Sequence, residues 1–204
     1  MRPIELKIKG INSYREEQVI NFNQLTSQGF FGIFGPTGSG KSTILDAITL
    51  ALYAKLPRGS KNFININETS ASVSFHFSIT TTETKEYLVE RSFRYPGKDR
   101  SSTARNTTAR LSLLSDIDTE VLADKPTDVT RSCIDLLGLS SDDFLRTVVL
   151  PQGQFSDFLK LKNQERRGML QRIFHLERYG IELTRKVAAA RQRMDIEVSS
   201  SEGQ

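Results

Sequence analysis

The sequence predicts an α/β protein with antiparallel β-strands and one long helix that leaves the domain. Three observations support this fold class. A glycine-rich loop separates a short apolar run from a helical pattern within residues 30–53. Apolar residues alternate with polar ones along 71–79 and again along 87–93, as in half-buried strands. From about residue 163, apolar positions recur every three or four residues, which is the period of a helix.

The glycine-rich loop has the spacing of a phosphate-binding loop. Residues 35–42, GPTGSGKS, match the pattern G-x-x-x-x-G-K-S. We predict that Phe30–Phe34 is a short buried strand and that Lys41–Tyr53 is a helix buried on most faces. Glycine at three loop positions permits backbone conformations in which several N–H groups point at one anion.

These residue types predict a site for ATP or GTP. The first turn of the helix adds unpaired N–H groups and a partial positive charge, and both favour a phosphate. Lys41 can reach the terminal phosphates, and the Ser42 hydroxyl is placed to bind Mg²⁺. An ordinary glycine-rich turn is the alternative, but the order of strand, loop and helix favours the nucleotide site. The predicted nucleotide contacts here are Gly35, Pro36, Thr37, Gly38, Ser39, Gly40, Lys41, Ser42 and Thr43.

The composition predicts a soluble cytoplasmic protein. The chain has 204 residues, of which 37% are apolar and 25% are charged. Charged residues near the start argue against a signal peptide, and no apolar run reaches the roughly 20 residues that cross a bilayer. The single cysteine, Cys133, excludes an internal disulfide, and its apolar neighbours predict packing. His76 and His175 are too isolated in the sequence to predict a zinc site.

Two segments concentrate positive charge. Residues 91–110 carry a net charge of +5 and residues 160–193 carry +7, although the whole chain carries only +4. Such clusters suit the phosphates of double-stranded DNA, because phosphate contacts supply most of the non-specific affinity for nucleic acid. A solvated loop and a solvated helix face are the alternatives.

Periodicity and turn signals place the remaining elements. Residues 101–110, SSTARNTTAR, contain no large apolar side chain, which predicts a loop. We predict one helix at Pro126–Leu137, with Gly138 just past its end, and a short helix that Ser140 caps and that runs to Arg146. Further strands are predicted at 4–9, 19–22 and 111–114.

Residues 163–204 predict the start of a coiled-coil arm. Their apolar residues are spaced alternately by three and four, as along the seam between two supercoiled helices. About 35 helical residues would extend roughly 50 Å, too far to pack on a small core. A surface helix of the same domain is the alternative. We therefore divide the chain into a lobe, 1–162, and a truncated arm, 163–204. The seam consists of Ile173, Leu176, Gly180, Leu183, Val187, Ala190 and Met194.

One part of an ATPase site is missing from the sequence. Phosphate-loop ATPases use an acidic residue at the end of an apolar strand to hold the magnesium shell and the attacking water. The best candidate, Leu111–Asp116, alternates apolar residues with serine, which is typical of an exposed hairpin. No LSGG-like signature occurs either. The chain is therefore predicted to hold half of an active site.

Three stretches resemble the amino-terminal head segment of the SbcC family, in the SMC-like branch of the ABC-type ATPases. They are GPTGSGKSTILDAITLALY at 35–53, LPQGQFSDFLK at 150–160, which is similar to the family's Q-loop, and IELKIKGINSYREEQVINF at 4–22. The resemblance implies a P-loop ABC-type ATPase half-head with antiparallel β-strands and an emerging coiled-coil helix. The acidic strand and the signature would lie on a carboxy-terminal lobe of the same protein.

The resemblance also implies roles for single residues. Gln152 would contact Mg²⁺ or the water beside the γ-phosphate of ATP, so it would act in catalysis with Lys41 and in metal binding with Ser42. Asn12 and Ser13 would contact the base and the ribose.

The resemblance further implies partners. ATP would join the head to that of a second copy on double-stranded DNA, and hydrolysis would release the two heads. An SbcD-type exo/endonuclease would dock near residues 160–204 and carry the nuclease activity in DNA double-strand-break repair. An SMC-type structural DNA clamp without a nuclease partner, or a secretion-type P-loop motor ATPase, is the alternative.

Overall fold

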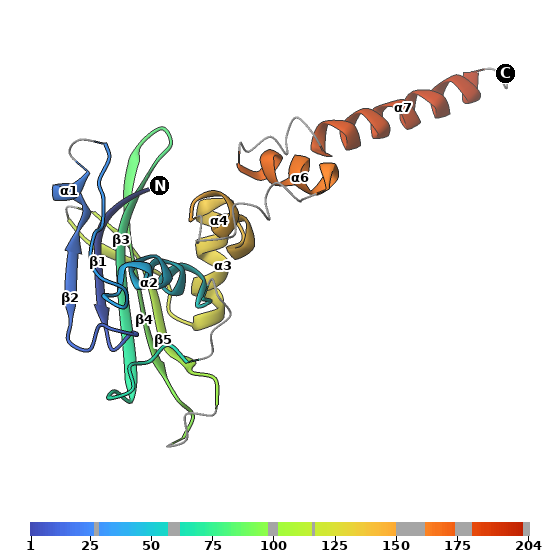
Figure 1. Cartoon of the computed structure of the whole chain (residues 1–204). Coiled ribbons are helices and arrows are strands. Elements are labelled where there is room, and N and C mark those ends of the chain that lie inside the picture. The colour runs from blue at the N-terminus through green and yellow to red at the C-terminus, as the bar shows by residue number, and fades with distance from the viewer. Residues whose placement is uncertain are drawn as a thin grey trace. The chain divides into compact units, whose positions relative to one another are not determined.

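The computed structural model describes residues 1–26, 29–56, 62–97, 102–115, 117–149, 162–173 and 181–201. The chain divides into two units, Met1–Leu137 and Gly138–Gln204. In the first unit, helices pack against a β-sheet (Figure 1). Within the described residues, no helix is both long and apolar enough to cross a membrane.

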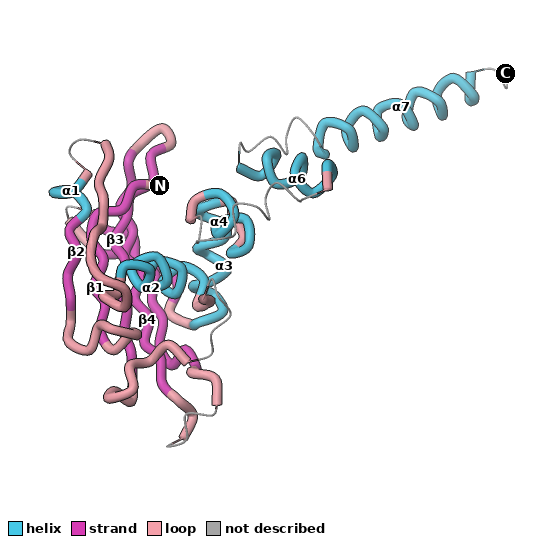
Figure 2. Tube along the Cα trace, viewed as in Figure 1, coloured by secondary structure: helices cyan, strands magenta, loops and turns pink. Residues whose placement is uncertain are grey.

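The first unit is built on a six-stranded sheet with the order β2-β1-β3-β4-β5-β6. Figure 2 draws the strands in magenta. Every neighbouring pair is antiparallel. The strands predicted at 4–9, 71–79, 87–93 and 111–114 are thus confirmed, and the strand predicted at 19–22 is confirmed up to Asn21. The sequence did not predict β6. The strands are β1 Arg2–Lys9, β2 Gln18–Asn21, β3 Ser70–Thr80, β4 Thr84–Arg94, β5 Arg105–Leu114 and β6 Thr119–Ala123. A short helix, α1 Phe22–Leu25, follows β2.

One face of the sheet carries the core. Side chains alternate between the two faces of a strand, so Val73, Phe75 and Phe77 of β3 are buried together. The helices α2, Lys41–Tyr53, and α3, Pro126–Leu137, pack against the strands. Further core residues are Leu6, Ile8, Val89, Leu111, Val129 and Cys133. The opposite face of the sheet carries polar side chains, among them Glu5, Lys7, Ser74, His76 and Glu90.

The helix α2 is buried along most of its length, as predicted. Nine of its thirteen residues are buried, so it lies between other elements and does not rest on the surface. Gly40 before its first turn and Ala54 after its last turn have left-handed backbone conformations, with φ of 91° and 53°. The Ala54 N–H donates to the Leu50 carbonyl oxygen at 2.9 Å and closes the last turn.

The apolar run Phe30–Phe34 is not a strand, so that prediction is wrong. Residues 30–34 have no regular secondary structure, and the side chains of Phe30 and Phe34 are 83% and 93% exposed. A strand requires a hydrogen-bonded neighbour, and none of the strands in the described part of the chain pairs with this run. Apolar composition alone did not supply that neighbour.

The predicted loop at 101–110 is also partly wrong, because residues from Arg105 onward belong to β5. They pair with β4 through the backbone, and Ala109 is buried in the core. The ladder of backbone hydrogen bonds therefore compensates for the missing large side chains. The run 111–114 ends this strand, and a turn leads on to β6. The candidate for the acidic strand, Leu111–Asp116, therefore begins in a hairpin, as expected. Asp116 itself lies outside the described residues.

The second unit contains α4 Ser141–Thr147, α6 Asn163–Ile173 and α7 Ile181–Ser201. Ser140 caps α4, as predicted: its Oγ accepts from the Asp143 N–H at 3.2 Å and donates to Asp143 Oδ2 at 2.7 Å. The seam residues Leu183, Val187 and Met194 are at least half exposed along α7. Leu176 and Gly180 lie outside the described residues, and the boundary at 162/163 stays a prediction.

Arg91 is a buried cation, with only 2% of its surface exposed. The prediction that it belongs to a DNA-binding surface is therefore wrong. It follows Val89 and precedes Phe93 on the core face of β4, so the alternation of the strand turns it inward. Three other basic residues of the same segment are exposed: Arg94, Arg105 and Arg110.

Cys133 of α3 lies beside this cation. Burial raises the pKa of the Cys133 thiol to about 11, and the Arg91 charge opposes the shift. An unfolded thiol has a pKa of about 8.5, so the unfolded chain loses this proton first as the pH rises. The native state then holds more protons than the unfolded state, and the free energy of unfolding falls. The contribution of Cys133 is complete below about pH 8.5 and is lost by about pH 11.

We predict that the free energy of unfolding falls more steeply between about pH 8.5 and 11 in the native protein than in Cys133→Ala. The expected difference between the two pH profiles is about 3 kcal/mol, from the gap between pKa values of about 8.5 and about 11. Urea denaturation at a series of pH values measures it. The two proteins differ only at residue 133, so parallel profiles would contradict the prediction.

Candidate phosphate-binding site

The loop 35–40 turns the chain sharply into the amino end of α2. Gly38 and Gly40 have φ of 85° and 91°, in a region that residues with a Cβ rarely adopt. The Ser39 N–H donates to the Pro36 carbonyl oxygen at 3.3 Å, and the Thr43 N–H donates to that of Gly40 at 2.9 Å. Beyond this turn, the first N–H groups of α2 have no preceding helical carbonyl to bind.

The side chain of Lys41 folds back onto the loop. Its Nζ donates to the carbonyl oxygens of Gly35 at 2.8 Å and Pro36 at 2.7 Å, and lies 3.5 Å from Ser39 Oγ. The ammonium group and the amino end of α2 thus lie at one loop, and both carry positive potential. This arrangement can bind an anion such as a phosphate group through charge and backbone N–H donors together.

The turn between β1 and β2 packs against this loop. Asn12 Nδ2 donates to Thr43 Oγ1 at 3.3 Å, and Ser13 Oγ donates to the Gly38 carbonyl oxygen at 2.7 Å. The ring of Tyr14 lies over Gly40, where an added Cβ would come within 2.8 Å of the ring. The structure therefore brings the two predicted residues of the turn into contact with the predicted loop.

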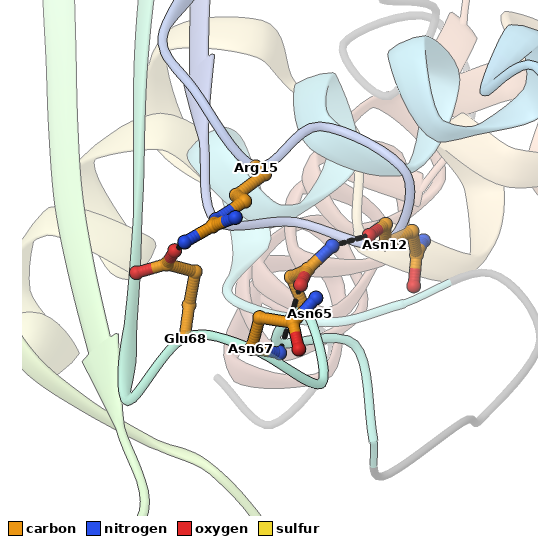
Figure 3. Close-up of polar contacts among 5 residues, drawn as sticks. All are labelled: Asn12, Arg15, Asn65, Asn67 and Glu68. Carbon is orange, nitrogen blue, oxygen red and sulfur yellow. Dashed lines mark hydrogen bonds and ion pairs between the residues drawn. The ribbon is translucent and has the colours of Figure 1, made fainter.

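A second segment, 62–68, holds the turn in place (Figure 3). Asn65 Nδ2 donates to the Asn12 carbonyl oxygen at 2.6 Å, and Asn65 Oδ1 accepts from the Asn67 N–H at 2.9 Å. The Asn12 N–H donates to the Phe63 carbonyl oxygen at 2.7 Å. Asn12 has a left-handed φ of 47°, which asparagine tolerates better than most residues. Its side chain is thereby held toward Thr43.

Two residues of this arrangement, Tyr14 and Asn65, were not predicted from the sequence. The pattern Asn65-Ile66-Asn67 is typical of a turn in which an asparagine side chain bonds the backbone two residues on. Nothing local in the sequence places that turn beside the β1–β2 turn. The ion pair between Arg15 and Glu68, at 3.0 Å, links the same two segments but is largely exposed and adds little stability.

All nine predicted residues of 35–43 lie at the loop or in the first turn of α2. Ser42 is exposed there, whereas Thr43 is buried. Mg²⁺ prefers oxygen ligands and usually binds phosphates together with one or two protein groups, so one accessible hydroxyl beside a phosphate site fits this ion. Gln152 and the rest of 150–160 lie outside the described residues, so their roles stay predictions.

A match over most of the chain shows its family. Residues 5–201 match the family model described as AAA domain. The chain belongs to this family. The AAA domain assignment confirms the predicted class of an α/β P-loop ATPase fold, here with an antiparallel sheet of six strands.

Three curated relatives place this AAA domain more narrowly. It is 49% identical to the SbcC subunit of the SbcCD nuclease of Clostridium acetobutylicum, with 100% of the chain and 18% of that protein covered. It is 51% identical to the SbcC subunit of the Bacillus subtilis nuclease, with 92% of the chain and 16% of that protein covered. It is 34% identical to a probable DNA double-strand break repair Rad50 ATPase of Aquifex aeolicus, with 93% of the chain and 18% of that protein covered. The predicted resemblance to the SbcC family is confirmed, and the chain spans less than a fifth of each relative.

We predict that Gly40→Ala lowers the free energy of unfolding by about 1–3 kcal/mol, because alanine is strained at this φ and its Cβ meets the Tyr14 ring. Urea denaturation measures the loss. Gly97→Ala is the control, since an added Cβ at Gly97 meets no atom within 4 Å. Equal stability of Gly40→Ala and the native protein would show that the turn is not constrained as described.

We predict that Asn65→Ala lowers the free energy of unfolding by about 1–2 kcal/mol, because two hydrogen bonds of the side chain are lost. Asn67→Ala is the matched control, since Asn67 enters this network through its backbone N–H. Thermal and urea unfolding of the two variants measure the difference. The prediction is wrong if both variants lose the same stability.

Proposed function

We propose that this chain is the ATP-binding half of an SbcC-type ATPase head. The observation that carries the proposal is the loop 35–43, where an ammonium group, a helix terminus and an exposed hydroxyl meet within an AAA domain. Two relatives are named as parts of a nuclease and a third as a double-strand break repair ATPase. These names support a role in DNA double-strand-break repair over a structural clamp or a secretion motor.

In this proposal, each residue of the loop has a distinct task. Lys41 exchanges the carbonyl oxygens of Gly35 and Pro36 for the terminal phosphates of ATP. Ser42 and Gln152 hold Mg²⁺, which when bound neutralises charge on the phosphates. Gln152 also orients the attacking water. Asn12 and Ser13, which already touch the loop, contact the base and the ribose.

The proposed head is completed by other parts. Phe30, Ile33 and Phe34 lead into the loop and are 83%, 42% and 93% exposed. A strand of a carboxy-terminal lobe of the same protein would pair with this run and cover it, and that lobe would supply the acidic residue. The signature of a second copy would close over the nucleotide, so that ATP joins two heads and hydrolysis releases them.

We assign the remaining partners, DNA and a nuclease, to the basic surface and the arm. Along α7, Arg185, Lys186, Arg191 and Arg193 are exposed. We propose that double-stranded DNA lies on basic surface of the head and that an SbcD-type nuclease docks near residues 160–204. The nuclease activity belongs to that partner, and the closing of the heads controls it.

We expect Lys41→Ala to weaken MgATP binding about 10- to 100-fold, because charge-assisted hydrogen bonds to phosphate are lost. Isothermal titration calorimetry of the full-length protein measures the affinity, and sedimentation with MgATP measures head association. Lys85→Ala is the control, since Lys85 is an exposed lysine of β4 that pairs with Ile79 of β3 beside the turn between these strands. Unchanged affinity and unchanged association in Lys41→Ala would overturn the proposal.

A further inference from the structure

Arg91 uses all five N–H donors of its guanidinium group inside the first unit. Its acceptors are neutral oxygen atoms from two helices and one strand. Nε donates to the carbonyl oxygen of Ala51 at 2.6 Å. Nη2 donates to the carbonyl oxygen of Leu52 at 3.2 Å and to Thr130 Oγ1 at 3.0 Å. Nη1 donates to the carbonyl oxygen of Pro126 at 3.3 Å and, with the Asn106 amide oriented to suit its neighbours, to Asn106 Oδ1 at 2.7 Å.

These bonds tie together the ends of two helices. Ala51 and Leu52 lie in the last turn of α2, where carbonyl oxygens have no partner within the helix. Pro126 and Thr130 lie at the start of α3, and Thr130 Oγ1 itself donates to the Pro126 carbonyl oxygen at 2.9 Å. From β4, Arg91 therefore holds the carboxyl end of the loop helix against the amino end of α3. Its positive charge also suits the negative end of the α2 dipole.

Stability alone does not account for an arginine at this place. None of the partners described for Arg91 is a carboxylate, and burial lowers the pKa of its guanidinium group. Removing a cation from water is costly even when every donor is bonded, and apolar residues of similar volume often replace buried charges without loss. Apolar contacts have no preferred direction, whereas the hydrogen bonds of a planar guanidinium group do. An apolar side chain would therefore not fix the orientation of the two helices.

We infer that Arg91 is a positioning residue for the nucleotide site, which sets the place of α2 along and about its own axis. The inference rests on the proposed function of the loop. The thirteen residues of α2 span about 20 Å, and a helix of this length moves as one body. A shift at its carboxyl end therefore moves Lys41 and Ser42 at its amino end by a similar amount.

The amino end of α2 has weaker attachments. The bonds described for the Lys41 side chain go to its own loop. Those described from the β1–β2 turn are the bond of Asn12 to Thr43, at 3.3 Å, and the bond of Ser13 to the Gly38 carbonyl oxygen, which is exposed. Two attachments, one at each end, fix the helix relative to the β1–β2 turn. With the guanidinium fork removed, α2 keeps its apolar burial but loses its register against the turn, and the phosphate contacts lose alignment.

The test is Arg91→Lys in the full-length protein, which keeps the charge but cannot hold both helices with a planar fork. We expect MgATP to bind about tenfold more weakly, equivalent to about 1.4 kcal/mol. Arg94→Lys is the surface control from the same strand, and it should bind MgATP like the native protein, because Arg94 is exposed. Titration calorimetry measures the affinity of each protein.

Leu111→Ala is the control for lost stability, since Leu111 is fully buried in β5 outside α2 and the Arg91 bonds. At temperatures where both variants are folded, only Arg91→Lys should weaken MgATP binding and raise hydrogen exchange at the amides of Lys41–Thr43. Native affinity in Arg91→Lys, or an equal loss in Leu111→Ala, would overturn the inference.

Two further outcomes remain separable. If Arg91→Lys does not fold, Thr130→Val removes a single acceptor while keeping the side-chain shape, and we expect about threefold weaker MgATP binding; native affinity there overturns the inference. If the native protein itself does not bind MgATP, the proposed function fails and the inference with it. Native binding with an unaffected Arg91→Lys overturns the inference alone.

Discussion

The burial of α2 is the constraint on which the rest of the first unit depends. A sheet with one apolar face must have that face covered, and α2 is part of the cover. Because most faces of the helix are enclosed, its position is decided by side chains on several elements at once. The position of α2 in turn fixes where the loop 35–40 ends, because the loop leads directly into the helix. The proposed binding of phosphate at the loop would therefore depend on packing elsewhere in the first unit.

Local chemistry explains what the sequence could predict. The helix that follows the glycine-rich loop and the cap at Ser140 depend on neighbouring residues, and both were predicted correctly. The nucleotide contacts of 35–43 stay predictions. The alternation in 71–79 and 87–93 predicted two strands, because each strand shows its buried face in its own residues. Each of these signals lies within a few residues of the structure that it predicts.

Non-local pairing explains what the sequence could not predict. Phe30–Phe34 has the composition of a strand but no neighbour in the described chain, whereas 105–110 lacks that composition and is a strand because β4 lies beside it. Asn65 reaches the site across 53 residues, and no local pattern indicates that contact. Arg91 was misread because net charge was counted over a segment; the alternation of Val89, Arg91 and Phe93 would have turned it inward.

The bonds that Lys41 makes to its own loop lower the net free energy that an anion would gain by binding there. The ammonium group is already solvated by two carbonyl oxygens, so an arriving phosphate competes with them and gains only the difference. A ligand with little negative charge would gain less from displacing these oxygen atoms than a triphosphate would. In the proposed site, the charge of the ligand would therefore contribute to selection in addition to contacts with the base and the ribose.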